Sequence, residues 1–248
     1  MIFFTDLDGT LIRSASKKRA GDIVVEYKDG AEITCISSKS SEILAKLDDI
    51  IPVTSRSIEQ YKRIDIPGFR PRYALVDNGG NLLVDGVPDK AWSKWSGAIA
   101  NKCREELENC RKLLEVDPDR SFEIRLVDGL FLFTKSNSPE NTLKRLADAA
   151  AGLDLYNTGV KVYAIPKEFD KGAAVQRLVD VLGRRGEKMI CAGDSVMDIS
   201  MLKCADVAIY PDDMGLQMNG FSCPRKEFCD FVVEKTMEIK GGTYGREN

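Results

Sequence analysis

Two carboxylates near the start of the chain are the first residues that could do chemistry. The stretch Met1–Leu11 reads MIFFTDLDGTL, so that Asp6 and Asp8 follow the wholly apolar run Ile2–Phe4. Such a run is typical of a strand buried on both faces of a parallel sheet, and ligands bind just beyond the carboxyl ends of these strands. A divalent cation would cancel the repulsion between the two carboxylates. An ordinary turn is the alternative, because Asp, Gly and Thr are common in turns.

Three polar residues follow the second apolar run, Ile50–Val53, and these are Thr54, Ser55 and Arg56. Ser57 and Gln60 then fit a capping box that opens a helix. Hydroxyls, backbone N–H groups and a guanidinium at a helix N-terminus form a natural anion site, with plain helix capping as the alternative. Because proline cannot donate to a central ladder, we expect Pro52 among the first residues of its strand.

Two further groups lie late in the chain. Asp170 is expected to cap a helix whose first turn holds Lys171, where a cation is disfavoured by the helix dipole. That lysine is therefore either solvated or directed at an anion. The apolar run Met189–Ala192 predicts another buried strand, and it leads into a second pair of carboxylates, Asp194 and Asp198.

Between these groups the chain changes its pattern. Asp-Gly at residues 29–30 separates two β-rich runs and predicts a hairpin beside Asp6 and Asp8. A strand is expected at Tyr73–Val76, leading into a turn at Asp77–Gly80, and one helical stretch is expected from Ala91 to about Glu115. Near the C-terminus we expect a helix around Phe231–Ile239, followed by a frayed end over residues 241–248.

A second hairpin is predicted over residues 121–135, turning at Asp128 and Gly129. A two-residue loop would pair Leu126 with Phe131 and Ile124 with Phe133, so that these four would share one apolar face with Phe122. A helix and two β-like runs, 153–156 and 160–165, follow. This is the pattern of an α+β domain inserted between the halves of a parallel α/β domain.

Composition and charge narrow the range of partners, locations and catalytic groups that the protein can have. The formal charge of −3, without a long basic block, does not favour a nucleic-acid or anionic-membrane partner. There is no apolar run long enough to span a bilayer and no signal-peptide pattern at the start, so a cytoplasmic protein is expected. The seven cysteines are scattered without a C-x-x-C pair and read as reduced thiols. Because the chain has no histidine, proton transfer must fall to carboxylates or amines.

Together these groups resemble the haloacid dehalogenase (HAD) superfamily, whose four motifs are D-x-D-G-T, a Thr or Ser, a Lys, and G-D-x-x-x-D. The specific matches here are D-L-D-G-T-L and G-D-S-V-M-D-I-S-M-L. The resemblance implies a Rossmann-like parallel-sheet core over residues 1–82 and 166–248, with an inserted α+β C2-type cap over residues 83–165. The Asn78-Gly79 turn and the Thr54-Ser55-Arg56 triplet are similar to those of the Cof-like and sucrose-phosphatase-like members. Those members usually read Thr-Gly-Arg at the triplet, so Ser55 departs from their pattern.

The resemblance also implies a role for each motif residue. Asp6 would be the nucleophile that forms an aspartyl-phosphate, and Asp8 would protonate the leaving oxygen and then activate water. Thr54 and Lys171 would hold the phosphoryl oxygens, with further phosphate contacts expected from Ser55, Arg56 and Asn78. Mg²⁺ would be bound by Asp6, the backbone carbonyl of Asp8 and Asp194, with Asp198 either a direct ligand or a residue that supports the ligands.

We expect the cap to select the substrate by covering the site. If the apolar face of the second hairpin packs on helices, its polar face looks towards Asp6, and the expected substrate contacts are Arg125, Lys161 and Tyr163. A solvated, charged sheet face is the alternative. The predicted function is Mg²⁺-dependent hydrolysis of a small phosphate ester, a sugar phosphate first among candidates. A phosphomutase of the phosphomannomutase type and a non-catalytic metabolite sensor are the alternatives. The sequence does not indicate an oligomeric state.

Overall fold

A five-stranded parallel sheet forms the centre of the protein, in a computed structural model that describes residues 1–244. Its strands stand in the order β15-β14-β13-β1-β5 and are β1 (Ile2–Thr5), β5 (Ile50–Pro52), β13 (Met189–Ala192), β14 (Val207–Pro211) and β15 (Gly220–Cys223). Every pairing in this sheet is parallel, which confirms the predicted α/β class. The carboxyl ends of β1, β5 and β13 therefore meet at one edge, where the polar groups of the sequence follow them.

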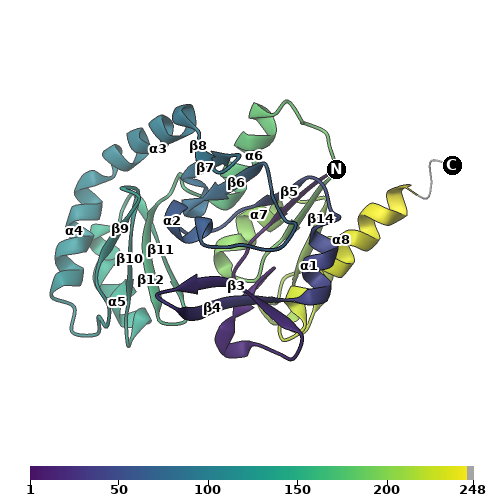
Figure 1. Cartoon of the computed structure of the whole chain (residues 1–248). Coiled ribbons are helices and arrows are strands. Elements are labelled where there is room, and N and C mark those ends of the chain that lie inside the picture. Colours follow the sequence, from purple (N-terminus) through teal and green to yellow (C-terminus); the bar gives the residue numbers. More distant parts are fainter. Residues whose placement is uncertain (245–248) are drawn as a thin grey trace.

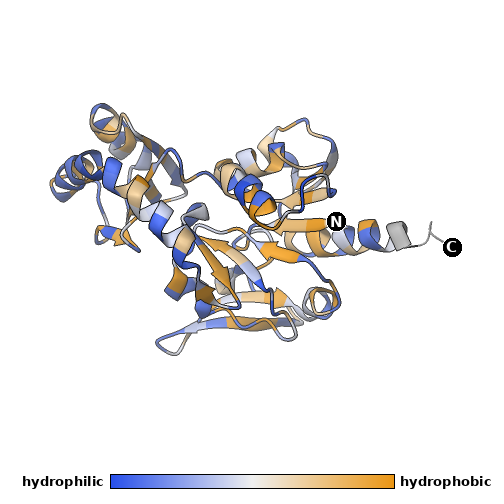
Figure 2. Ribbon diagram, turned by 90° about the horizontal axis from the view of Figure 1, so that it is seen from above, coloured by the Kyte–Doolittle hydropathy of each residue, from blue (hydrophilic) through white to orange (hydrophobic). Residues whose placement is uncertain are grey.

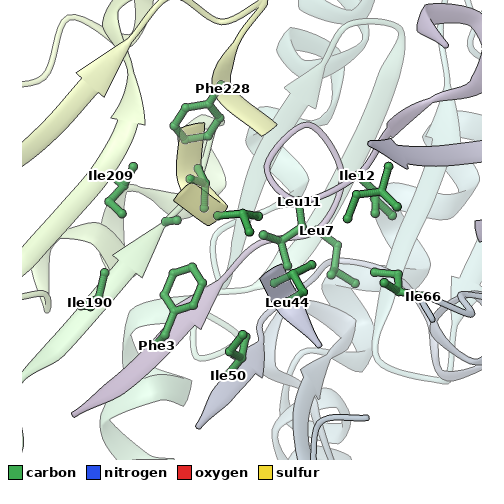
Figure 3. Close-up of a cluster of buried hydrophobic side chains, with 14 of the residues drawn as sticks. Phe3, Leu7, Leu11, Ile12, Leu44, Ile50, Ile66, Ile190, Ile209 and Phe228 are labelled. Atoms are coloured by element: carbon green, nitrogen blue, oxygen red, sulfur yellow. The ribbon is translucent and has the colours of Figure 1, made fainter. Parts of the chain in front are cut away.

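Helices cover both faces of this sheet. On one face Phe3, Ile190 and Ile209 pack with α1 (Ser38–Leu44) and α8 (Phe228–Tyr244), and Figure 3 shows Phe3 and Phe228 in this cluster. On the other face lie α6 (Lys171–Val181) and α7 (Ile199–Lys203). Successive residues of β1 alternate between the two clusters, which is why its sequence is continuously apolar. The hydrophobic colour in Figure 2 accordingly concentrates in these strands.

A four-stranded antiparallel sheet and three helices lie at the end of the molecule away from α8 (Figure 1). Its order is β11-β12-β10-β9, with β9 (Arg125–Val127), β10 (Phe131–Lys135), β11 (Leu153–Thr158) and β12 (Lys161–Pro166). The helices are α3 (Lys90–Lys102), α4 (Arg104–Glu115) and α5 (Pro139–Leu146). One face of the sheet packs on α4 and α5 through Leu132, Val162 and Ala164. The other face is turned towards the end of β1.

Two small antiparallel sheets complete the chain. The first joins β2 (Arg13–Ser14) to the predicted hairpin of β3 (Asp22–Lys28) and β4 (Ala31–Ser37). The second contains β6 (Tyr73–Val76), β7 (Asn81–Val84) and β8 (Val87–Pro88), and a single parallel bridge joins it to the central sheet between Val53 and Leu75. A short helix, α2 (Ile58–Lys62), begins with the predicted capping box of Ser57 and Gln60. Short 3₁₀ turns lie at Ala15–Lys17, Asp77–Gly79, Ala147–Ala149, Val196–Asp198 and Asp212–Met214.

The predicted register of the second hairpin is wrong by one residue. Phe131 pairs with Val127 and Phe133 with Arg125, because the chain turns over three residues, Asp128–Leu130, and not two. Since side chains alternate between the faces of a strand, this slip exchanges the faces. Phe131 and Phe133 therefore lie on the same face as Arg125, away from α4 and α5, while Leu132 packs against those helices.

Three other predictions need correction. Pro52 ends its strand and does not begin it. The next residue, Val53, donates its N–H to Thr5 of β1, so the nitrogen of Pro52 faces away from β1. The proline therefore costs the strand ladder no hydrogen bond. The helical stretch after Lys90 is two helices that meet at Cys103. The last helix continues through Tyr244 and so includes residues expected to fray; residues 245–248 of that prediction lie outside the described chain.

Two general properties follow from the described residues. All seven cysteines are free thiols. None of the helices within residues 1–244 is both long and apolar enough to cross a membrane.

Candidate active site

A buried cluster of charges lies where β1 ends. The ammonium of Lys171 is 2.7 Å from Asp6 Oδ1 and 2.6 Å from Asp198 Oδ1, and all three side chains are almost fully excluded from solvent. Asp6 continues the strand ladder, since its N–H donates to Ala192 of β13. The backbone thus fixes the carboxylate at the edge of the sheet, and the lysine bridges residues that are far apart in the sequence.

The position of Lys171 follows from the helix that it begins. Asp170 caps α6 by accepting a hydrogen bond from Ala173 N, so Lys171 is the first helical residue. Asn78 supports the same place, because its Nδ2 donates to the carbonyl of Phe169 at 2.6 Å. The lysine is directed at two carboxylates and not at water, which offsets its unfavourable place at a helix N-terminus.

Asp198 is held rigidly by the turn that contains it. Its Oδ2 accepts hydrogen bonds from Asp194 N at 3.1 Å, from Ser195 N at 2.9 Å and from Ser195 Oγ at 2.7 Å. Its other oxygen is left for Lys171. Gly193 makes this turn possible, since a Cβ there would stand 2.3 Å from the Cβ of Asp198.

Asp194 lies beside the DxD turn at the end of β1. Gly9 has a φ of +84°, and a Cβ at this position would meet Asp194 Oδ2 at 2.4 Å, so only glycine fits. Thr10 Oγ1 donates to Asp194 Oδ1 at 3.3 Å, and Arg225 contacts Oδ2 at 2.7 Å. Arg225 also binds Asp213, so its positive charge is shared.

The carboxylates of Asp6, Asp194 and Asp198 form a group that fits a divalent cation. One oxygen from each lies within 4.8 Å of the others. Burial raises the pKa of Asp6 well above its ordinary value and outweighs Lys171, whose positive charge lowers it; the neighbouring carboxylates add to the rise. Burial and Asp198 raise the pKa of Asp194 to about 6. Crowded oxygen donors with raised pKa values are what a hard cation such as Mg²⁺ would stabilise.

Asp8 is engaged differently from Asp6. Its two oxygens accept hydrogen bonds from Arg56 Nε at 2.6 Å and Nη2 at 2.7 Å. Burial alone would raise the pKa of Asp8, but these bonds and the charges of Arg56, Lys161 and Lys171 hold it below its ordinary value. Asp8 is therefore a carboxylate at neutral pH in this structure.

Arg56 is in turn held by the first hairpin. Its Nη1 lies 2.9 Å from Glu26, a residue of β3 that is almost fully buried and that also binds Arg63 at 3.1 Å and Thr34 at 3.2 Å. Irregular pairing between β3 and β4 on both sides of Glu26 accompanies this inward position. The hairpin thus contacts the site through a chain of charges, Glu26 to Arg56 to Asp8.

Thr54 and Ser55 lie next to the DxD turn, because β5 is the neighbour of β1. Thr54 is fully buried, and its hydroxyl accepts a hydrogen bond from Arg56 N at 3.2 Å. Ser55 lies beside the side chain of Tyr163, which belongs to β12, and both line the same cavity. Asn78, in contrast, already gives its amide to Phe169, which makes it a support for α6.

A cavity of about 1400 Å³ opens above Asp8. Arg125, Lys161 and Tyr163 line it together with Ser55 and Arg56, so the structure brings the expected cap residues to the side of the chemical groups. The face of the sheet that carries them differs in composition from the one expected. The face that carries them is the aromatic one, with Phe131 and Phe133, since the hairpin register is shifted.

Several residues of the site escaped the sequence analysis. Arg225 and Glu26 reach it from segments without a local motif, so no pattern in the sequence could indicate them. Ser195 carries a readable signal, because Ser195 and Asp198 form a reciprocal capping box within the G-D-x-x-x-D motif. The hydroxyl of Thr10 donates to Asp194, a partner far away in the sequence.

Comparison with known families gives the class of the protein. The sequence model of haloacid dehalogenase-like hydrolases matches residues 89–241. The chain therefore belongs to the haloacid dehalogenase-like hydrolases, as its motifs predicted, and is an enzyme of that family. A search of curated proteins found no match.

Solved structures with the same fold can be named as well. The chain is 13% identical to the sucrose-phosphatase from Synechocystis sp. PCC6803, with a TM-score of 0.68 over 96% of this chain and 98% of that one. It is 16% identical to the C-terminal domain of C. albicans trehalose-6-phosphate phosphatase, with a TM-score of 0.59 over 98% and 92% of the chains. A HAD subclass IIB sugar phosphatase is also 16% identical, with a TM-score of 0.59 over 97% and 98%. At these identities the likeness establishes the fold alone.

Proposed function

We propose that the protein is a Mg²⁺-dependent phosphatase that hydrolyses a small phosphorylated metabolite, with a sugar phosphate as the first candidate. One observation carries the proposal: Asp6 is buried at the end of β1, bridged to Lys171 and grouped with Asp194 and Asp198. A carboxylate nucleophile needs its charge offset before it can approach a phosphoryl group, and these neighbours offer that.

The metal site would consist of Asp6, Asp194 and Asp198, with the backbone carbonyl of Asp8. When bound, Mg²⁺ would offset the negative charge of the phosphoryl group and of the carboxylates. The structure supports this assignment because Asp6 and Asp198 share one ammonium, while the cation beside Asp194, Arg225, is divided between Asp194 and Asp213.

The chain's own residues divide the remaining tasks. Asp6 attacks phosphorus and forms an aspartyl-phosphate, and the P–O bond to the leaving group breaks. Lys171 and the Thr54 hydroxyl bind phosphoryl oxygens, with Ser55 at the rim. Asp8 gives its proton to the leaving oxygen, then takes one from the water that attacks the intermediate.

Arg56 controls the proton of Asp8 in this proposal. As long as the guanidinium binds both carboxylate oxygens, the pKa of Asp8 stays low. We expect the negative substrate to compete for Arg56, which would raise the pKa of Asp8 and let it act as an acid.

The division of labour between the two ends of the molecule is part of the proposal. Residues 1–82 and 166–248 would form the core that does the chemistry, and residues 83–165 the cap that selects the substrate. Supporting this view, the antiparallel sheet lines the cavity with Arg125, Lys161 and Tyr163, and Tyr163 reaches Ser55 of the core.

A screen of phosphorylated metabolites for release of inorganic phosphate tests the function. We expect turnover that EDTA abolishes and Mg²⁺ restores, because the buried carboxylates need a cation to accept a phosphoryl group. Activity that persists through chelation would refute the metal assignment. Return of the phosphoryl group to a second substrate hydroxyl, without phosphate release, would instead indicate a phosphomutase.

A further inference from the structure

The cavity is much more basic than the rest of the protein. Its lining contains eleven Lys and Arg residues and five Asp and Glu residues, whereas the whole chain has 36 and 39. One phosphoryl group bound at Asp6 and Lys171 does not account for this excess, because most of the basic residues lie outside that cluster.

Two lysines of the antiparallel sheet face each other without an acidic partner. Lys135 on β10 and Lys161 on β12 are directly opposite in the register, and both line the cavity. Within residues 1–244 neither ammonium forms an ion pair; the one ring contact, of Lys135 with Phe122, is at 4.9 Å. Like charges directly opposite on neighbouring strands are destabilising. An anion bound between them would remove this cost.

A third cation stands beside this pair. Arg125 on β9 is 4.8 Å from the centre of the Phe122 ring, which it shares with Lys135. Its acidic partner, Glu123, is 61% exposed, so a ligand can replace it at little cost. The three cations therefore converge on one region of the cavity wall.

Aromatic rings line the wall between these cations and the core. The ring centres of Phe122 and Phe133 are 6.1 Å apart, and those of Phe133 and Tyr163 are 5.2 Å apart. Tyr163 lies beside Ser55, and the positive charge of Lys161 helps to lower the pKa of Asp8. The wall thus leads from the acid–base carboxylate to the cationic region, as the body of a bound substrate would.

We propose that Lys135, Lys161 and Arg125 form a second anion site, which binds a negatively charged group of the substrate other than the phosphoryl group that is transferred. This inference rests on the proposed phosphatase function. It narrows the substrate class to phosphate monoesters that carry a second phosphate or a carboxylate, with a compact body packed on Phe133 and Tyr163. The cavity of about 1400 Å³ has room for both groups.

Matched pairs of esters test the proposal. Glycerol 3-phosphate and 3-phosphoglycerate differ by one carboxylate, and fructose 6-phosphate and fructose 1,6-bisphosphate differ by one phosphate. We expect kcat/KM to favour the second member of at least one pair about tenfold or more, since a charge-assisted hydrogen bond contributes about that factor. The preference should shrink as salt is raised.

Variants locate the effect. In Lys135→Gln and Lys161→Gln proteins we expect the preference within a pair to fall about tenfold, mainly through KM. Lys112→Gln is the control, because Lys112 is an exposed lysine of α4 that does not line the cavity. A preference that is absent in the wild-type protein, or unchanged in both variants, would overturn the second site.

A binding measurement separates this proposal from the phosphatase proposal. Calorimetry with the Asp6→Asn protein does not depend on turnover. Tighter binding of 3-phosphoglycerate than of glycerol 3-phosphate, lost in Lys161→Gln, would support the second site even if no ester were hydrolysed. Equal dissociation constants within both pairs would overturn it while leaving the phosphatase proposal untouched.

Discussion

The charged groups at the end of β1 and those on the antiparallel sheet follow opposite rules. Lys171 is buried and shared by Asp6 and Asp198, whereas Lys161 is exposed and has no acidic partner in the part of the chain that the structure describes. A buried charge must be compensated within the protein, while an exposed one can be left free for a ligand. In the proposed function, the first region would therefore bind the one invariable group, the phosphoryl, and the second would recognise what differs between substrates.

The same substitution at these two lysines tests the comparison most strongly. Lys171→Met should leave two buried carboxylates uncompensated and lower the free energy of unfolding by about 3–5 kcal/mol. We also expect kcat to fall by about 10³-fold, as for loss of one charge-stabilising donor. Lys161→Met should change the free energy of unfolding by less than about 0.5 kcal/mol. Chemical denaturation and phosphate release measure both, and equal destabilisation by the two variants would refute the contrast.

Arg56→Gln is expected to have the next largest effect. Without its guanidinium the pKa of Asp8 rises, because Arg56 is what holds it down against burial. Since Asp8 must be protonated to act as an acid, activity should persist to higher pH, while kcat/KM falls about tenfold or more. Arg63→Gln is the control, because Arg63 binds Glu26 but not Asp8. A pH profile of kcat that shifts downwards, or not at all, would contradict the role of Arg56.

The smallest effect on catalysis is expected where the two regions meet. Asp77, next to Asn78, is buried, and Asp128 at the tip of the second hairpin is close enough to affect it. Burial raises the pKa of Asp77 to about 8, the hydrogen bond from Asn81 opposing the rise and Asp128 adding to it. Because an unfolded carboxyl titrates near pH 4, the folded protein binds one more proton between about pH 4 and 8. This group's contribution to stability is therefore complete below about pH 4 and declines as the pH rises towards 8.

Asp77→Asn should remove that decline, since an amide does not titrate in this range. Melting temperatures of the wild-type and variant proteins from pH 5 to 8.5 would show it as a flatter curve for the variant. Asp148→Asn, at an exposed site, is the control. Identical slopes in all three proteins would mean that Asp77 is not protonated in the folded state.

The sequence predicted the first region far better than the second. Asp6, Asp8, Asp194 and Asp198 each follow an apolar run, so local pattern places them at strand ends, and the parallel pairing of β1 with β13 brings them together. Tertiary partners such as Arg225 and Glu26 have no such signal. They reach the site from the segment after β15 and from an irregular strand pairing, which only the folded chain reveals.

The second region depended on a detail that sequence patterns do not fix. Asp128-Gly129 suits a two-residue turn, yet Leu130 joins the loop and shifts the register by one. That single residue decides whether Phe133 or Leu132 faces the cavity. Arg125, Lys161 and Tyr163 do line it, but Lys135 was missed because its importance arises from the pairing with Lys161.

Trapping of the intermediate tests most directly whether Asp6 carries the phosphoryl group. An Asp8→Asn protein, mixed with a hydrolysed ester and quenched in acid, should hold one phosphoryl group on the peptide that contains Asp6, because attack on the intermediate lacks its base. The Asp6→Asn protein should carry none and release phosphate at least about 10⁴-fold more slowly than the wild type. Undiminished phosphate release by the Asp6→Asn protein would contradict the account.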